Sequence, residues 1–301
     1  MGWRIKMNKD FGIIVLNYLN YEDTIELIKN LNSQKWFDQI NLYVVDNHSN
    51  NESADEIRRI QQKICFTFLE SENNSGFAVG ENIGFKKALE DGCNFIASIN
   101  NDTLIDPKQV DFLDKIRRIH KNDKSIGLIT IDIENLDGVK QNPLQEFSPS
   151  LLKVLLIKLF FNLYLHKVYY FLRIHMFYEL INKYVDYRDR SKLKEYKNPI
   201  LSNSRFIYAA HGSFVVFTPS FFEYFSGHNE QTFLFCEEFI RAEELRSKGL
   251  KTWLCMDLSI KHKESKTIKM LKRTKKDRVI FLLKNMFDSC KIYAKILRFR
   301  S

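Results

Sequence analysis

Short apolar runs alternate with more polar, helix-like segments through the first half of the chain. Runs of this length, bounded by polar or turn-forming residues, are typical of buried strands. The predicted strands are Phe11–Asn17, Ile40–Asp46, Cys65–Glu70, Asn94–Asn100 and Ile126–Ile133. The segments between them favour helices: Tyr21–Ser33, Ala54–Lys63, Gly80–Asp91 and Val110–His120. This alternation predicts an α/β chain whose mostly parallel sheet carries helices on both faces.

The second half departs from this pattern. Residues 138–204 are rich in Leu, Phe, Tyr and Lys without strand alternation, so we predict a helical insertion. Strands are predicted again at Phe206–Phe217 and Thr252–Leu258, on either side of an acidic-then-helical stretch, Gln231–Gly249. The chain ends in a basic segment with helical character. We therefore divide it into four parts: 7–137, 138–204, 205–262 and 263–301.

Charge and cysteine usage narrow the class of protein. The net charge of +9 over 301 residues favours nucleic acid, anionic lipid or phosphorylated ligands as partners without choosing among them. Five scattered cysteines, with no CxxC spacing, argue against a disulfide framework or a zinc site and for reduced cytosolic thiols. The most apolar stretch, Val154–Leu172, carries Lys158 and Lys167, so we reject it as a membrane span. The apolar run Phe11–Leu16 is too short for an export signal.

Polar residues recur where the predicted strands end. Asn17, Asp46 and Asn100–Asp102 occupy these positions. In parallel sheets ligands bind beyond the carboxyl ends of the strands, and a carboxylate there can hold a divalent cation that binds a diphosphate. The alternative for any one residue is that Asn and Asp simply favour turns. The set as a whole indicates a ligand site.

Three glycines, Gly76, Gly80 and Gly84, open the third predicted helix. Small residues allow backbone N–H groups to approach a phosphate at a helix start. Their GxxxGxxxG spacing does not support a dinucleotide site of the GxGxxG type.

Two further groups carry acid–base or ligand chemistry. Glu237 and Glu238 follow an apolar run, and mutual repulsion would raise the pKa of one of them into the range of a general base. The alternative is an acidic first helical turn that the helix dipole favours. His211-Gly212 and His262 follow or interrupt predicted strands, although a lone histidine is more often structural.

Taken together and in order, these segments resemble family 2 glycosyltransferases with the GT-A fold. The resemblance covers about residues 11–135 and 205–270 and is nearest to bacterial capsule, O-antigen and similar surface-polysaccharide enzymes. The segments that carry it are IIVLNYLN (Ile13–Asn20), VVDNHSN (Val44–Asn50), NNSGFAVGENIG (Asn73–Gly84), SINNDT (Ser98–Thr103), HGSFVVF (His211–Phe217), FLFCEEFIRAEELRSKG (Phe233–Gly249) and IKHKES (Ile260–Ser265).

The resemblance implies a role for individual residues in donor binding. Asp46 matches an aspartate that contacts the nucleotide base, Asn17 lies on a loop that lines the nucleotide, and Asn82 lies in a segment near the donor. Asn101 and Asp102 fall in the metal-binding motif, whose first carboxylate is replaced by Asn100. The full predicted nucleotide-sugar site is Asn17, Asp46, Gly76, Asn82, Asn101, Asp102, His211 and Gly212.

The resemblance also implies the chemistry. Glu238 matches the catalytic base, with Glu237 beside it, and a further Asp often found two residues on is Ile240 here. Asp102 and His262 would hold Mn²⁺ or Mg²⁺, which stabilises the leaving nucleoside diphosphate. Glu238 would take the proton of the acceptor hydroxyl in a single, inverting displacement. The alternative is a catalytically degenerate subunit that binds a nucleotide sugar.

The implied partners are a nucleotide-diphosphate sugar and a glycan or lipid-linked glycan acceptor. A lipid-linked acceptor predicts a cytoplasmic protein bound peripherally to the membrane. Leu151–Tyr187 combines apolar, aromatic and basic residues, and Lys261–Lys276 carries eight basic residues, which suits an anionic leaflet. The alternative is that the first segment packs internally and the second is merely solvated. Few aromatic residues interleave Lys261–Lys276, which argues against nucleic-acid binding.

Overall fold

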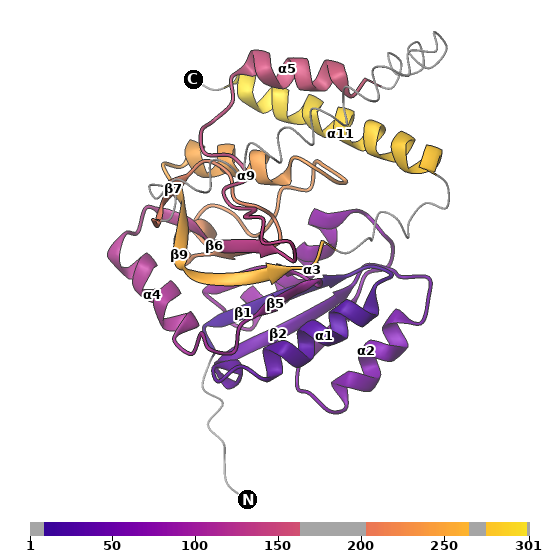
Figure 1. Ribbon diagram of the computed structural model, residues 1–301, viewed down its shortest axis with the longest axis vertical. Coiled ribbons are helices and arrows are strands. Elements are labelled where there is room, and N and C mark those ends of the chain that lie inside the picture. The colour runs from indigo at the N-terminus through magenta and orange to yellow at the C-terminus, as the bar shows by residue number, and fades with distance from the viewer. Residues whose placement is uncertain (1–8, 163–202, 265–274, 300–301) are drawn as a thin grey trace, which may run out of the picture.

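The computed structural model of the chain describes residues 9–162, 203–264 and 275–299 (Figure 1). Within these ranges the strands form one nine-stranded sheet. The strands are β1 (Phe11–Asn17), β2 (Ile40–Asp46), β3 (Thr67–Glu70), β4 (Phe95–Asn100), β5 (Thr103–Ile105), β6 (Ile126–Asn135), β7 (Arg205–Ile207), β8 (Phe214–Phe217) and β9 (Lys251–His262).

The sheet has a parallel half and a mixed half. Its order is β3-β2-β1-β4-β8-β6-β9-β5, and β7 pairs with β9. The strands β3, β2, β1 and β4 are all parallel, as the strand–helix alternation predicts. β8 then runs antiparallel between β4 and β6, β9 runs parallel to β6, and β5 is antiparallel to β9. The β5–β9 pair places Thr103–Ile105, from the first half of the chain, next to Ile260–His262.

Helices cover both faces of the sheet. They are α1 (Tyr21–Asn32), α2 (Ser53–Gln61), α3 (Phe77–Glu90), α4 (Phe112–Asn122), α5 (Leu151–Phe160), α8 (Pro219–Phe222), α9 (Glu237–Ser247) and α11 (Lys275–Arg298), with a 3₁₀ turn, η1, at Phe37–Gln39. Successive residues of β1 point to opposite faces. Ile13 packs in the cluster that holds Leu27 of α1, whereas Ile14 packs in the cluster that holds Phe85 of α3. The predicted α/β architecture is confirmed.

A further layer, formed by α5 and α11, lies outside α9. The two helices run side by side at one end of the molecule (Figure 1). Val154 of α5 and Tyr293 of α11 join Cys236 and Ile240 in a third apolar cluster. The rest of the predicted insertion, 163–202, and residues 265–274 of the basic tail lie outside the described residues. Within the ranges described, no helix has the length and apolar character to cross a bilayer.

The predicted strand Phe206–Phe217 is wrong as a single element. The structure divides it into β7, on the outer edge of β9, and β8, in the centre of the sheet. Between them Ala209 forms an isolated bridge with Gln145, and the backbone N–H of His211 donates to Asn142 Oδ1 at 2.7 Å. Hydrogen bonds to the 141–146 segment therefore pull the chain out of the sheet, and the resulting loop carries His211 and Gly212.

Candidate functional site

Strand register brings Asp102 and His262 together across 160 residues of sequence. Thr103, the first residue of β5, pairs with His262 at the end of β9, and the carbonyl of Asp102 accepts the N–H of Lys263 at 2.9 Å. The side chains meet with His262 Nε2 3.2 Å from Asp102 Oδ1, and both are at least nine-tenths buried. The two residues assigned to metal binding are thus neighbours at one edge of the sheet.

Hydrogen bonds fix the orientation of the His262 ring. Gln141 Nε2 donates to the Glu264 carboxylate at 2.5 Å, so the amide oxygen of Gln141 must face the other way. That oxygen lies 2.7 Å from His262 Nδ1. Because an amide oxygen only accepts, Nδ1 carries a proton, and Nε2 is the nitrogen directed at Asp102.

This arrangement suits a shared cation. A neutral His262 would present the Nε2 lone pair to a carboxylate oxygen 3.2 Å away, and two acceptors at that distance repel unless a proton or a metal ion lies between them. Imidazole and carboxylate are both ligands of Mn²⁺-type cations. Among the described residues no group of three or more His, Cys, Asp and Glu side chains forms a metal cluster. A cation held by Asp102 and His262 would therefore need ligands beyond the His, Cys, Asp and Glu side chains of the described residues.

Glu238 faces the same region from α9. A Cβ placed on Gly212 would lie 2.8 Å from Glu238 Oε1, so the carboxylate rests directly against this glycine. Next to Gly212, the His211 ring lies 5.4 Å from the His262 ring in an edge-to-face contact. A row of contacts thus runs from Glu238 past Gly212 and His211 to His262 and Asp102. It joins the predicted base to the predicted metal ligands.

A strained turn sets the start of α9. Phe235 and Cys236 both have positive φ, 76° and 66°, a conformation that non-glycine residues rarely adopt. Ser289 of α11 holds this turn by donating its hydroxyl to the Leu234 carbonyl at 2.8 Å. The helix begins immediately afterwards, so Glu237 and Glu238 form its first turn. Backbone strain of this kind persists where surrounding structure enforces it, often at functional sites.

Burial changes the acidity of Glu237. Desolvation raises the pKa of this carboxyl to about 7, and the negative charge of Glu238 adds to the rise. Glu237 Oε1 is buried and has no hydrogen-bond partner, which agrees with a cost to its charged form. The favourable helix dipole at this position does not outweigh desolvation.

The raised pKa makes stability depend on pH. Between the ordinary value of 4.5 and about 7, the folded protein holds a proton on Glu237 that the unfolded chain has released. The folded state binds more protons in this window, so the free energy of unfolding falls as pH rises through it. Glu237→Gln should remove this loss and be more stable than the wild type at pH 8 by up to about 3 kcal/mol, with a smaller gain at pH 5.

Chemical denaturation at the two pH values measures the effect. Glu72→Gln, a matched change at an exposed position, is the control and should shift stability equally at both. A gain from Glu237→Gln that is the same at pH 5 and pH 8 would contradict the assignment.

Asn17, Asp46 and Asn101 form a second, polar network at the ends of the parallel strands. Asn17 Nδ2 donates to Asp46 Oδ1 at 2.7 Å, and Asp46 also accepts the backbone N–H and the hydroxyl of Ser49. Thr24 links Asn17 to Asn101 by donating to the first and accepting from the second. These contacts fix the loops after β1 and β2 and leave Asp46 only 3% exposed.

The structure gives Gly76, Gly80 and Gly84 a packing role. A Cβ on Gly76 would lie 2.5 Å from the Phe233 carbonyl oxygen, and φ is +107° there. The first N–H group of α3, that of Phe77, donates to the same carbonyl at 3.1 Å. Gly80 and Gly84 let α3 approach Leu16 and Ile14 of β1. The close approach that these glycines allow is therefore to protein, and Phe233 covers part of the helix start.

Asn82 holds a loop against α3. Its amide nitrogen donates to the His228 carbonyl at 2.9 Å and to Glu230, and its oxygen accepts the His228 N–H at 2.7 Å. The side chain clamps the 228–230 loop to α3.

A chain of buried hydrogen bonds, here called the polar relay, connects α3 to α9. The sequence analysis did not predict it. Glu81 accepts the Ser98 hydroxyl at 2.7 Å and lies 2.6 Å from His228 Nε2. Arg241 donates to His228 Nδ1 at 2.9 Å, which leaves the ring proton on Nε2, facing Glu81. Burial and the charge of Arg241 lower the pKa of His228, which agrees with a neutral ring. Arg241 lies three residues after Glu238, so the relay anchors the helix that presents it.

The sequence contained one sign of this relay, which is a charged residue inside the glycine-rich helix. Glu81 is fully buried between Gly80 and Asn82. The sequence around Glu81 gives no indication that His228 and Arg241, about 150 residues further along, belong to the same network. Gln141 and Glu264, which orient His262, were missed for the same reason.

Comparison with known proteins identifies the family of the chain. The family model described as Glycosyl transferase family 2 matches residues 12–187, more than half of the chain. The chain belongs to glycosyl transferase family 2. The matched range of this glycosyltransferase contains Asp46 and Asp102, whereas His211, Glu238 and His262 lie beyond it. The fold brings His262 next to Asp102, and the family match does not include these later residues.

Solved structures agree on the fold. TarS from S. aureus matches with 14% identity and a TM-score of 0.52 over 85% of this chain and 37% of TarS. The mannosyltransferase PcManGT from Pyrobaculum calidifontis, solved with GDP-Man and Mn²⁺, matches with 14% identity and a TM-score of 0.53 over 96% of this chain and 72% of its own. GalNAc-T7, solved with UDP, GalNAc and Mn²⁺, matches with 10% identity and a TM-score of 0.55 over 85% and 44%.

These likenesses establish the GT-A fold for the family 2 chain. At 14% identity or less they establish nothing finer. The chain spans well under half the length of TarS. Curated protein sequences give no match.

Proposed function

We propose that this family 2 glycosyltransferase moves a sugar from a nucleoside-diphosphate sugar to an acceptor hydroxyl, with inversion at the anomeric carbon. The observation that carries the proposal is the row of contacts from Glu238 to Asp102. It sets a carboxylate of α9 beside the His211–His262–Asp102 group, so that a base and a cation site adjoin one another.

Glu238 is the general base of the proposed reaction. It accepts the proton of the acceptor hydroxyl while that oxygen attacks the anomeric carbon. One displacement inverts the configuration and needs no nucleophile from the protein. Glu237, whose pKa lies near 7, is protonated for part of the time at neutral pH and keeps the net charge of the pair low.

Asp102 and His262 would hold Mn²⁺ or Mg²⁺, which would supply positive charge against the leaving nucleoside diphosphate. Gln141 keeps His262 Nε2 directed at the site, and such outer hydrogen bonds tune metal affinity.

The polar network of Asn17, Asp46 and Asn101 forms the nucleoside end of the proposed donor site. It adjoins Asp102 through the Asn101–Asp102 peptide. Structures of similar fold have been solved with GDP-Man and with UDP-GlcNAc, which supports a nucleotide-sugar donor here. The proposed acceptor is a glycan or lipid-linked glycan of a capsule, an O-antigen or a related surface polysaccharide, used at the cytoplasmic face of the membrane.

A thermal-shift screen over UDP-, GDP-, dTDP- and CMP-sugars, with and without Mn²⁺, tests the donor. Ligand at 100 times its Kd stabilises the folded state by about 2.7 kcal/mol, so one donor class should raise the melting temperature by several degrees. Hydrolysis of that donor then separates a working enzyme from a subunit that only binds. If no nucleotide sugar shifts the melting temperature, the proposal fails.

A further inference from the structure

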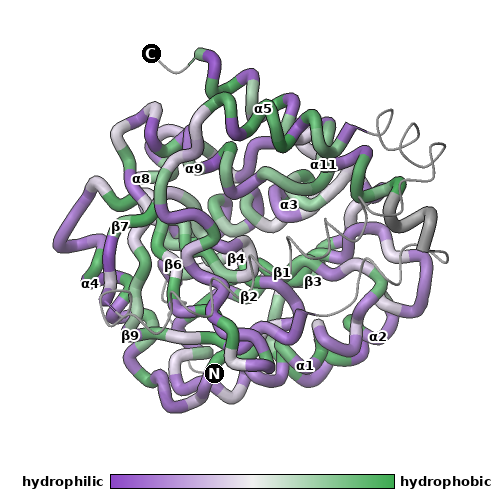
Figure 2. Tube along the Cα trace, turned by 45° about the horizontal axis from the view of Figure 1, so that its top comes forward, coloured by the Kyte–Doolittle hydropathy of each residue, from purple (hydrophilic) through white to green (hydrophobic). Residues whose placement is uncertain are grey.

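The helix α5 exposes apolar side chains that a water-facing helix would not carry. Leu152, Leu156 and Leu159 are 67%, 58% and 54% exposed, and their i, i+4, i+7 spacing places them on one face. The opposite face is also apolar, since Val154 is buried against α11. Figure 2 shows α5 as a mostly hydrophobic segment at the periphery of the molecule.

This helix is suited to a membrane surface and not to a span. Its ten residues extend only about 15 Å, half the thickness of the hydrocarbon core. One face of α5 packs against α11, and within the described part of the chain the leucine face stays exposed. Exposed apolar patches of this kind mark protein or membrane contacts.

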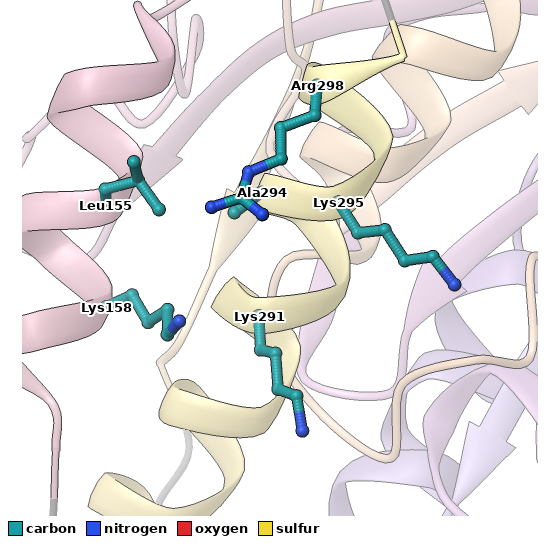
Figure 3. A pocket seen from close by; sticks show the side chains of 6 residues that line it. All are labelled: Leu155, Lys158, Lys291, Ala294, Lys295 and Arg298. Carbon is teal, nitrogen blue, oxygen red and sulfur yellow. The ribbon is translucent and has the colours of Figure 1, made fainter.

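Four basic residues line a shallow cavity beside the leucine face, and the side chains of Lys291 and Lys295 extend away from the gap (Figure 3). The cavity, of about 250 Å³, lies between α5 and α11 and is lined by Leu155, Lys158, Lys291, Ala294, Lys295 and Arg298. Figure 3 shows Lys158 and Arg298 directed toward the gap between the helices. Leu155 is adjacent to both Leu152 and Leu159 on the helix surface, so the apolar face adjoins the cavity.

Basic residues outnumber acidic ones around this cavity. Lys291, Lys295 and Arg298 recur at i, i+4, i+7 on α11, and in the described part of the chain none of the four forms an ion pair with a carboxylate. Asp288 lines the adjoining hollow together with Lys291 and Lys295. The four basic residues outnumber this one acid, so the region attracts an anion.

We propose that the outer face of α5, with the α5–α11 cavity, docks on an anionic membrane, where the cavity takes a lipid phosphate headgroup. The leucines enter the acyl boundary while the cations meet the phosphates. A free phosphate ion would use the cations but leave the three leucines without a role, so their adjacency favours the lipid.

The docking face lies close to the candidate base. Ser289, two residues before Lys291, holds the turn that begins α9, and Cys236 in that turn lies 3.8 Å, sulfur to sulfur, from Cys290. The docking helix α11 is thus in direct contact with the turn that presents Glu238. This surface deepens the membrane location proposed above, and its test does not depend on sugar transfer.

Vesicle sedimentation tests the surface with the full chain. Vesicles of phosphatidylcholine with 30% phosphatidylglycerol should bind the protein, and pure phosphatidylcholine should not. The quadruple variant Lys158→Gln, Lys291→Gln, Lys295→Gln, Arg298→Gln should lower the partition coefficient more than about tenfold. The triple variant Leu152→Ser, Leu156→Ser, Leu159→Ser should also lower it, because it keeps the charge and removes the apolar face.

A matched variant controls for net charge. Lys35→Gln, Lys63→Gln, Lys86→Gln, Lys121→Gln removes four exposed cations outside the two helices and should change binding much less. Equal losses from the two quadruple variants would reduce the claim to general charge and overturn the site. Competition of inorganic phosphate at millimolar levels, with no effect of the leucine variant, would identify a free-anion site instead. Loss of self-association in the leucine variant, with vesicle binding unchanged, would assign the face to a second copy of the chain.

Discussion

Glu238→Gln should reduce sugar transfer by at least about a hundredfold, the lower range for loss of a general base. The amide keeps the size of the carboxylate and its contact with Gly212 but cannot accept the hydroxyl proton. Folding and donor binding should therefore be unchanged. Initial rates at saturating donor, together with donor Kd from calorimetry, separate the two effects.

Glu244→Gln provides the matched control on the same helix. Glu244 accepts a hydrogen bond from Asn229 at 2.7 Å, and a glutamine oxygen can accept it equally. This variant should retain transfer within a fewfold of the wild type. If Glu238→Gln also retains near-normal transfer, the base is elsewhere, and Glu237 is the next residue to test.

Asp102→Asn should abolish Mn²⁺-dependent donor binding. Loss of the carboxylate charge leaves His262 as the remaining protein ligand of the pair, and two ligands are already few for a divalent cation. Binding of the free nucleoside through the Asp46 network should persist, because Asp46 and Asn101 keep their own partners. Mn²⁺ titration followed by electron paramagnetic resonance measures the metal directly, without relying on turnover.

Gln141→Leu supplies a graded comparison for the same measurement. It removes the acceptor that holds the proton on His262 Nδ1, and loss of such an outer partner typically costs 10- to 100-fold in metal affinity. The affinity for Mn²⁺ should thus fall less than in Asp102→Asn. Wild-type transfer that continues unchanged in EDTA would show that the metal role is wrong and that the enzyme works without a cation.

The sequence by itself determined the parallel half of the sheet and the edge at which its polar residues lie. Strands such as Phe11–Asn17 are short, apolar and locally bounded, so their positions follow from the nearby residues alone. The alternation with helices then implies parallel pairing, and parallel pairing places Asn17 and Asp46 at one edge. The position of each strand depends on nearby residues, which a single sequence displays, although the β1–β4 pair joins more distant segments such as Phe11 and Phe95.

Only the tertiary structure decided how the second half of the chain completes the site. The pairing of β5 with β9, the departure of His211 and Gly212 from the sheet, and the contact between Glu238 and Gly212 all join distant segments. Packing also decided what the residues of α3 contact. The glycines of α3 allow contact with β1 and Phe233, and Asn82 clamps a loop. Burial and partners are properties of the folded chain, since they depend on which distant groups exclude water from a side chain.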